Sequence, residues 1–231
     1  MVCSPESVAC RSVVPRYTPP VSDAFADARE RMVARQLAAR DISDPRVLDA
    51  MRRVPRHRFV APEQAGEAYA DYPLSIGHGQ TISQPYIVAY MVEQLRLTPA
   101  SRVLEIGTGC GYHTAVLAQL AGHVYSIEIV DALARRARET LDALSIVNVT
   151  IATRDGNAGW PEHAPYDAIT VAAATTEVPL ALVEQLAVGG RLIIPVGGDE
   201  FQTLHLIEKR ANGSTDVALI DVRFVPLIWP N

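Results

Sequence analysis

The segment from Val103 to Gly111 places the strongest constraint on the fold of this chain. It reads Val-Leu-Glu-Ile-Gly-Thr-Gly-Cys-Gly, an apolar run that leads directly into three glycines spaced two apart. Short apolar runs are typical of buried strands, and closely spaced glycines let the backbone turn tightly beside a ligand. A helix is expected to begin at Tyr112. The segment therefore predicts a strand, a glycine-rich loop and a helix, a unit with which open α/β sheets bind ligands.

After Pro99 the chain alternates short apolar runs with stretches of helical periodicity. The expected strands are Arg102–Ile106, Val124–Ile127, Val147–Ala152, Ala168–Ala172 and Arg191–Pro195. The expected helices lie near residues 112–121, 131–144 and 178–187. This alternation predicts a parallel sheet with crossover helices on both faces. Two further strands, Thr203–Glu208 and Val217–Val222 around Asn212-Gly213, predict an antiparallel hairpin at one edge.

Helices are also expected ahead of the sheet. Apolar residues at helical spacing follow Asp23, and Asp44-Pro45 is expected to open a second helix, which Pro55 ends. Residues 59–84 are interpreted as a loop. A further helix is expected from Pro85, since proline suits the first position of a helix, and it should run through Leu97.

The chain is thus expected to form one α/β domain after a flexible leader at residues 1–22. The leader holds four prolines and no apolar period, so we expect it to make no core contacts and its deletion to leave the fold unchanged. Residues 23–231 would form a single domain, with helices and a loop over 23–98 and the sheet over 99–231. The expected fold class is a doubly wound, mostly parallel sheet with antiparallel C-terminal strands and N-terminal helices.

Charge and composition narrow the function classes. A formal net charge of −5 argues against a broad electrostatic contact with nucleic acid or an anionic membrane. A basic cluster at Arg52–Arg58 is interpreted as a solvated helix end. The three cysteines and six histidines show no spacing typical of metal ligands, so no metal is expected. The odd cysteine count and the lack of a signal segment favour a reduced, cytoplasmic protein.

Two classes of cofactor use a glycine loop of this kind. A dinucleotide site requires Gly-x-Gly-x-x-Gly, with the pyrophosphate at the helix N-terminus, but Tyr112 stands where the third glycine belongs. Glu105, two residues before the first glycine, would repel a pyrophosphate. A carboxylate at that position suits the cationic methionine end of S-adenosylmethionine, so the loop favours this methyl donor.

Two more acids follow strands of the predicted sheet. Glu128 ends the second strand and can accept hydrogen bonds from both ribose hydroxyls. Asp155-Gly156 follows the third strand, where the aspartate can accept a hydrogen bond from the adenine amino group. Taken singly, Glu128 could be a surface acid and Asp155-Gly156 a simple turn. Three acids at strand ends of one sheet favour a site for the methyl donor.

The segment from Asp71 to Pro85 closely resembles the substrate loop of protein-L-isoaspartate O-methyltransferases. It contains Gly-Gln-Thr-Ile-Ser at residues 79–83, which other methyltransferases with the glycine loop lack. The resemblance extends from about Arg31 to Leu227. It is also carried by Leu104–Tyr112, Tyr166–Ile169, Gly189–Gly197 and Arg223–Leu227. It implies a Rossmann-like, S-adenosylmethionine-dependent methyltransferase that methylates the free carboxylate of L-isoaspartyl residues in damaged proteins and peptides.

The resemblance also implies roles for individual residues. Ser83 corresponds to the active-site serine, although a serine there could instead cap the helix that opens at Pro85. The positions it assigns to the cofactor are Thr81, Ile82, Glu105, Gly107, Thr108, Gly109, Glu128, Ile129, Asp155, Gly156 and Gln202. Those it assigns to the substrate are Gln80, Ile82, Ser83 and Ala173. The expected partners are isoaspartyl proteins and peptides, with no nucleic acid or membrane, and the enzyme is expected to act as a monomer.

Several positions depart from the family pattern. Ser75 replaces a usual proline and Arg154 a usual glycine, while His113 replaces a common glutamine and is interpreted as a neutral helix residue. Ala172, with Thr175 and Thr176, replaces a Thr…Pro-Pro segment beside the expected substrate cleft. These changes leave open a related carboxyl methyltransferase that acts on aspartate in a dedicated peptide or on a small acid. A non-catalytic binder of damaged protein is the other alternative.

Overall fold

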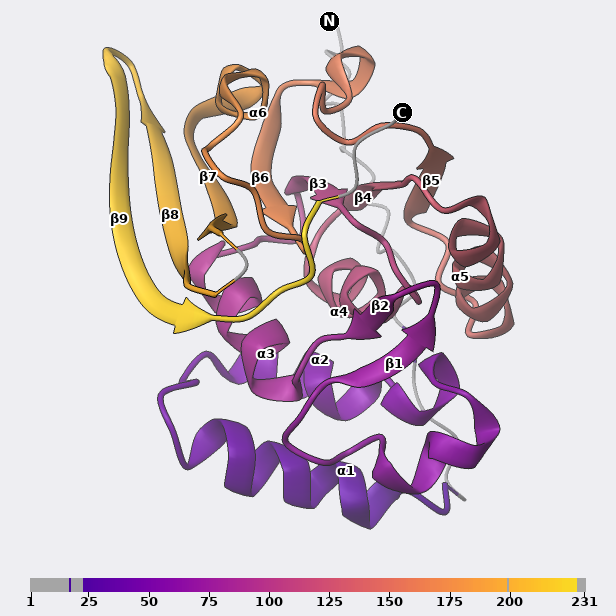
Figure 1. Ribbon diagram of the computed structural model, residues 1–231. Helices are drawn as coiled ribbons and strands as arrows, with labels where there is room; N and C mark the ends of the chain where they lie inside the picture. Colours follow the sequence, from indigo (N-terminus) through magenta and orange to yellow (C-terminus); the bar gives the residue numbers. More distant parts are fainter. Residues whose placement is uncertain (1–16, 18–22, 199, 228–231) are drawn as a thin grey trace, which may run out of the picture.

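A seven-stranded sheet forms the centre of the protein in the computed structural model, which describes residues 17, 23–198 and 200–227. Its spatial order is β5-β4-β3-β6-β7-β8-β9 (Figure 1). The strands are β3 (Arg102–Ile106), β4 (His123–Glu128), β5 (Val149–Thr153), β6 (Tyr166–Val171), β7 (Leu186–Gly197), β8 (Gln202–Arg210) and β9 (Gly213–Val222). The strands β3 to β7 are parallel to one another, β8 runs antiparallel to β7, and β9 runs antiparallel to β8.

The direction of the chain through the sheet reverses beside β3. From β3 the chain moves outward through β4 to β5, and it then returns to β6, which lies on the other side of β3. In open α/β sheets ligands bind outside the carboxyl ends of the strands at such a switch point. The doubly wound, mostly parallel sheet with an antiparallel edge confirms the fold class expected from the sequence.

Helices cover both faces of the sheet, as the alternation of patterns predicted. They are α3 (Pro85–Gln94), α4 (Tyr112–Leu120), α5 (Asp131–Ala143) and the short α6 (Leu180–Glu184). Every residue of α4 is buried, so this helix lies in the core directly behind the glycine loop. The helix α6 is shorter than expected because Leu186 already pairs with Tyr166 as the first residue of β7.

The N-terminal helices gather at one end of the molecule, where they are coloured indigo to purple in Figure 1. They are α1 (Ala26–Met32), a π-helical turn over Val33–Ala38, and α2 (Pro45–Arg53). Asp44 caps α2 as expected, since its side chain accepts a hydrogen bond from the Arg46 backbone N–H at 2.8 Å. The helix ends at Arg53, just ahead of Pro55, also as expected.

Two interpretations from the sequence were wrong in this region. Residues 59–84 are not only loop, because they contain a hairpin of β1 (Leu74–Gly77) and β2 (Gln80–Ile82). The turn between them places Gly77, His78 and Gly79 at positive φ. Arg56 is not solvated: it is completely buried, its Nε donates to the carbonyl of Ala68 at 2.6 Å, and its guanidinium lies 4.9 Å from the Tyr112 ring centre.

Almost all of the predicted leader lies outside the described residues. Tyr17 is the one residue of it that the structure describes, and its partly buried ring packs against the main core cluster. The expectation of no core contacts therefore does not hold at this position. No helix in the described part of the chain has the length and apolar character needed to cross a bilayer.

Candidate active site

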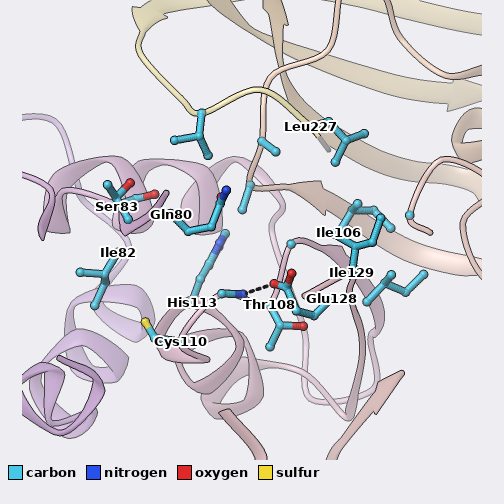
Figure 2. A pocket seen from close by; sticks show the side chains of 18 of the residues that line it. Gln80, Ile82, Ser83, Ile106, Thr108, Cys110, His113, Glu128, Ile129 and Leu227 are labelled. Atoms are coloured by element: carbon cyan, nitrogen blue, oxygen red, sulfur yellow. Dashed lines mark hydrogen bonds between the residues drawn. The ribbon is translucent and has the colours of Figure 1, made fainter. Parts of the chain in front are cut away.

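A cavity opens at the carboxyl ends of β3, β4 and β6, at the switch point of the sheet (Figure 2). About 780 Å³ of non-atom space lies within it, open solvent included. The predicted site residues that line it are Gln80, Thr81, Ile82, Ser83, Gly107, Thr108, Gly109, Glu128, Ile129, Gly156 and Ala173. Segments far apart in the sequence thus form one site, as the resemblance implied.

The glycine loop forms the floor of the cavity. Gly107, Gly109 and Gly111 have φ values of 93°, 55° and 88°, a left-handed conformation that L side chains rarely adopt. The amides of Gly107 and Thr108 both donate to the carbonyl of Ile127 on β4, at 2.8 and 3.1 Å. The loop therefore stays close to the sheet and exposes its backbone, rather than side chains, to a ligand.

Glu128 holds a carboxylate at the wall of the cavity. Its Oε2 accepts a hydrogen bond from the Gly109 backbone N–H at 2.7 Å, drawn as the dashed line in Figure 2, and its Oε1 accepts one from the Val130 N–H at 2.9 Å. The residue is only 6% exposed. Each carboxylate oxygen can accept a further bond, so two vicinal hydroxyls of a ligand could bind here.

Ser83 lies where this cavity meets a second hollow. Thr81, Ser83, Ala172 and Val225 line both, and the second hollow is further bounded by Gln84 and residues 221–224. The N-cap of α3 is Gln84, and no side chain in the described part of the protein caps that helix. Ser83 is therefore not the helix cap, and it lies at the junction of the two hollows.

Three predicted cofactor residues do not line the cavity. Glu105 is completely buried behind the loop, where its Oε2 accepts hydrogen bonds from the hydroxyls of Thr114 at 2.5 Å and Ser126 at 2.6 Å. Burial raises the pKa of the Glu105 carboxyl to about 7. Among the described residues no cation lies beside this buried acid, which makes its ionised form costly. Because Glu105 does not line the cavity, it can act on a ligand there only through a neighbouring residue.

Asp155 and Gln202 hold backbone segments that shape the cavity wall. The Asp155 Oδ1 accepts hydrogen bonds from both the backbone and the side chain of Asn157, at 3.0 and 2.9 Å. Gln202 is buried. Its side-chain amide donates to the Phe224 carbonyl at 3.0 Å and accepts from the Phe224 backbone N–H at 2.6 Å. The segment that follows Phe224 then reaches the cavity.

Sequence reasoning assigned no role to several residues that line the cavity. These are Val88, Ile106, Cys110, Tyr112, His113, Ile127, Arg154, Ala172, Val225, Pro226 and Leu227. Cys110, Tyr112 and His113 adjoin the glycine loop in sequence, which was a usable signal. Residues 225–227 carry no chemical signal, and they reach the cavity through backbone bonds to Ala174.

The residues present fit S-adenosylmethionine. The exposed backbone of the glycine loop and the fixed Glu128 carboxylate offer sites for its polar groups. His113 also lines the cavity, and its buried Nε2 has no partner among the described residues. A dinucleotide fits less well, because the side chain of Tyr112 is buried where that motif requires a glycine.

Comparisons with known proteins identify the family of the chain. The family model for protein-L-isoaspartate(D-aspartate) O-methyltransferase (PCMT) matches residues 27–229. A protein-L-isoaspartate O-methyltransferase of Synechococcus sp. (strain JA-2-3B'a(2-13)) is 54% identical over 217 residues, which cover 91% of this chain and 89% of the relative. The Opitutus terrae protein of the same name is 56% identical over 205 residues, 88% of each chain.

Solved structures agree as well. A structure named protein-L-isoaspartate O-methyltransferase superposes with a TM-score of 0.78 at 31% identity, covering 86% of this chain and 65% of its own. A Plasmodium falciparum protein described by the same activity, in complex with S-adenosyl-L-homocysteine, gives a TM-score of 0.74 at 31% identity, covering 87% and 98%. The chain therefore belongs to the protein-L-isoaspartate(D-aspartate) O-methyltransferase family.

Proposed function

We propose that this protein transfers a methyl group from S-adenosylmethionine to the free carboxylate of L-isoaspartyl residues in damaged proteins and peptides. The observation that supports it best is the position of Ser83, which lines both the cofactor cavity and the second hollow and does not cap α3. A methyl donor in one and a peptide carboxylate in the other would meet at this residue.

Residues on three sides of the cavity would hold the cofactor. Glu128 would accept hydrogen bonds from the ribose hydroxyls, and Ile129 and Gly156 would contact the adenine. Gly107 and Gly109 would bring backbone against the methionine end. When bound, S-adenosylmethionine supplies an electrophilic methyl group on a positively charged sulfur.

The chain itself needs to position the substrate rather than activate it. A carboxylate is already ionised at pH 7, so methyl transfer requires no general base. Ser83 would donate a hydrogen bond to one carboxylate oxygen and hold the other in line with the methyl carbon, and alignment of this kind contributes much of the rate. The opposite charges of the reactants merge in the transition state, which a site that excludes water favours.

The product fits a role in repair. The methyl ester would close to a succinimide as the neighbouring backbone nitrogen displaces methanol, and hydrolysis of that ring returns part of the material as normal aspartate. The experiment that tests the function is transfer of labelled methyl to an isoaspartyl peptide, with the aspartyl peptide of the same sequence as control. Labelling of the isoaspartyl peptide alone supports the proposal, and equal labelling of both refutes it.

A related carboxyl methyltransferase, acting on aspartate in a dedicated peptide or on a small acid, is the second candidate. The observation in its favour is Ala172, which lines both hollows where the family pattern has a larger residue. Thr175 bears on this less, because it is buried and its backbone is bonded to β7. A panel of isoaspartyl peptides, aspartyl peptides and small acids separates the two candidates.

We further propose that the enzyme acts as a cytoplasmic monomer on polypeptides. The free, buried thiol of Cys110 is typical of proteins in a reducing compartment. The second hollow is lined by residues of one chain, so a polypeptide could bind there without a second subunit. Sedimentation of the purified protein at micromolar concentration tests the oligomeric state.

A further inference from the structure

Two buried polar side chains face each other beneath the cavity, and each has an atom without a partner. Glu105 satisfies its Oε2 with two hydroxyls, but its Oε1 has no hydrogen-bond partner among the described residues. The Nδ1 of His113 lies 3.6 Å from that Oε1. The Nε2 of His113 is also without a partner in the described part of the chain, and His113 lines the cavity (Figure 2).

The contact between these two side chains can select the tautomer of His113. At 3.6 Å the His113 Nδ1 and the Glu105 Oε1 lie just beyond hydrogen-bond length. Once a small side-chain rotation brings them together, an ionised Glu105 accepts from the Nδ1–H of a neutral imidazole, and Nε2, which is closed to solvent in this structure, keeps its lone pair for a ligand. A protonated Glu105 can donate to Nδ1 instead, and Nε2 then carries the hydrogen. The same ring is therefore a hydrogen-bond acceptor or a donor in the cavity, according to the state of an acid behind it.

Within the described residues, no opposite charge affects the pKa of Glu105. Its neighbours are Ser126 on β4, Thr170 in register on β6, and His113 and Thr114 on α4. The nearby charged group is Glu128, a like charge, which adds to the effect of burial in raising the pKa of Glu105. Burial also lowers the pKa of His113 to about 4, so the ring is neutral at physiological pH. A cation brought into the cavity would complete this arrangement.

We propose that His113 is a further binding residue for the methyl donor, whose α-ammonium group donates a hydrogen bond to Nε2, and that Glu105 is the positioning residue that fixes the required tautomer. This inference rests on the proposed function. With the ribose at Glu128 and the methyl group directed to Ser83, the methionine end lies on the side of the glycine loop and α4. An ammonium group there needs acceptors, and a histidine backed by a carboxylate is a suitable one.

The proposal makes cofactor binding depend on pH in one direction. The ammonium group stabilises ionised Glu105, so binding lowers the pKa of that carboxyl and releases a proton when the pH is near 7 or below. By linkage, affinity then rises with pH and levels off above the pKa of the free enzyme. For a pKa of about 7, we expect an affinity about tenfold higher at pH 8 than at pH 6.

Isothermal calorimetry with S-adenosyl-L-homocysteine, which keeps the α-ammonium, tests the linkage without reference to activity. Titrations at pH 6, 7 and 8, in buffers of different ionisation enthalpy, measure both affinity and proton release. The wild-type protein should show the tenfold change, whereas Glu105→Gln should release no proton and change less than about twofold. Nitrogen NMR of His113 should find hydrogen on Nδ1 at pH 8 and on Nε2 in Glu105→Gln.

Further variants separate binding from a structural role. His113→Leu should bind about tenfold or more weakly at pH 8, and His113→Gln, whose amide oxygen can accept, should recover part of that loss. Gln119→Leu removes another buried polar side chain from the far end of α4 and should leave affinity unchanged. A wild-type affinity and tautomer that do not change with pH, or a Leu variant that binds normally, overturn the proposal. Absence of binding at every pH would instead refute the cofactor assignment itself.

Discussion

The free hydroxyl of Ser83 allows its two possible roles to be separated by one substitution. Because Ser83 does not cap α3, Ser83→Ala should lose much less than the roughly 1 kcal/mol of a lost helix cap. If the hydroxyl positions the substrate carboxylate, turnover should fall by a factor of about ten to a thousand. Steady-state kinetics with an isoaspartyl peptide measure the change in turnover, and thermal melting of the same preparation measures the change in stability.

A matched control for Ser83 lies away from the cavity. The hydroxyl of Ser101 accepts a hydrogen bond from the Thr98 backbone N–H at 2.9 Å, so Ser101→Ala should lower stability and leave turnover of the folded enzyme intact. A normal turnover rate in Ser83→Ala would show that this serine takes no part in the reaction.

Glu128 should contribute to cofactor binding more than to turnover. The ribose hydroxyls change little between ground and transition state, so Glu128→Ala removes uniform binding. We expect a loss of about 1.5–3 kcal/mol in affinity for S-adenosyl-L-homocysteine, with turnover at saturation little changed. Glu93→Ala is the control, since Glu93 likewise accepts from two backbone N–H groups, those of Ser43 and Asp44, but far from the cavity. Equal affinities in the two variants would contradict the ribose assignment.

Residue chemistry was predictable from the sequence where a side chain faces the cavity directly. Glu128 follows a strand and carries the right group, and it lies at the wall as expected. Glu105 carries the same group one strand earlier, yet it is completely buried. The difference arises because Glu105 lies within its strand, opposite Ser126 and Thr170, and periodicity alone does not show what covers it.

At the level of elements, β3 and α4 meet through Glu105 and His113, and the pair should affect stability in opposite ways. The pKa of Glu105 is raised from 4.5 to about 7, so its contribution to stability is present at low pH and lost as pH rises between these values. The pKa of His113 is lowered from 6.5 to about 4, so its contribution is present above 6.5 and lost as pH falls. The two dependences nearly cancel between pH 4.5 and 6.5.

Single variants should show the separate pH dependence of stability that each of the two residues contributes. Relative to wild type, Glu105→Gln should gain about 3 kcal/mol in free energy of unfolding as pH rises from 4.5 to 7. His113→Gln should gain about as much, relative to wild type, as pH falls from 6.5 to 4. Urea denaturation across this range measures both, and the subtraction removes the titrations of all other groups. Differences that stay constant with pH would show that neither group has a shifted pKa.

The contact between β3 and the turn after β5 leaves no room for a side chain at Gly156. A Cβ atom built there would lie 2.3 Å from the Ile106 Cγ2, so one of the two segments must move. Gly156→Ala should therefore cost about 1–3 kcal/mol of stability and should also weaken cofactor binding. Gly66→Ala is the control, because a Cβ there meets nothing within 4 Å. Chemical denaturation measures the stability of both variants. Equal stability of Gly156→Ala and Gly66→Ala would mean that the turn after β5 adjusts freely.

The elements with a strong signal were predicted, and those that depend on tertiary contacts were not. The strand over Arg102–Ile106 and the start of a helix at Asp44-Pro45 were predicted correctly. The β1–β2 hairpin was missed because Gly77 and Gly79 interrupt its short apolar alternation, and its two strands form only against each other. The helix α6 was predicted too long because its end is set by pairing of Leu186 with β6.

For the whole molecule, the sequence predicts the parallel sheet but not the order of its strands. Alternating patterns are compatible with several orders, and the reversal beside β3 follows from which strands pair in three dimensions. That reversal places the glycine loop next to β6 and allows Ala172 and residues 225–227 to reach the same cavity. The resemblance to a known family supplied this arrangement, and residue patterns alone did not.

The role of the N-terminal leader can be tested by dividing it at Tyr17. Tyr17 lines a shallow hollow with Phe25 and His57 and packs against the main core cluster, so Tyr17→Ala should lower stability by about 1–2 kcal/mol. Deleting residues 1–16, which have no apolar period, should leave the melting temperature unchanged, whereas deleting 1–22 should match the Tyr17→Ala variant. Tyr17 does not line the cavity, so methyl transfer at low temperature should persist in Tyr17→Ala, and we expect it to persist in both deletions. If deletion of 1–16 lowers the melting temperature as much as deletion of 1–22, the segment before Tyr17 also contributes to the stability of the domain, and division of the leader at Tyr17 is wrong.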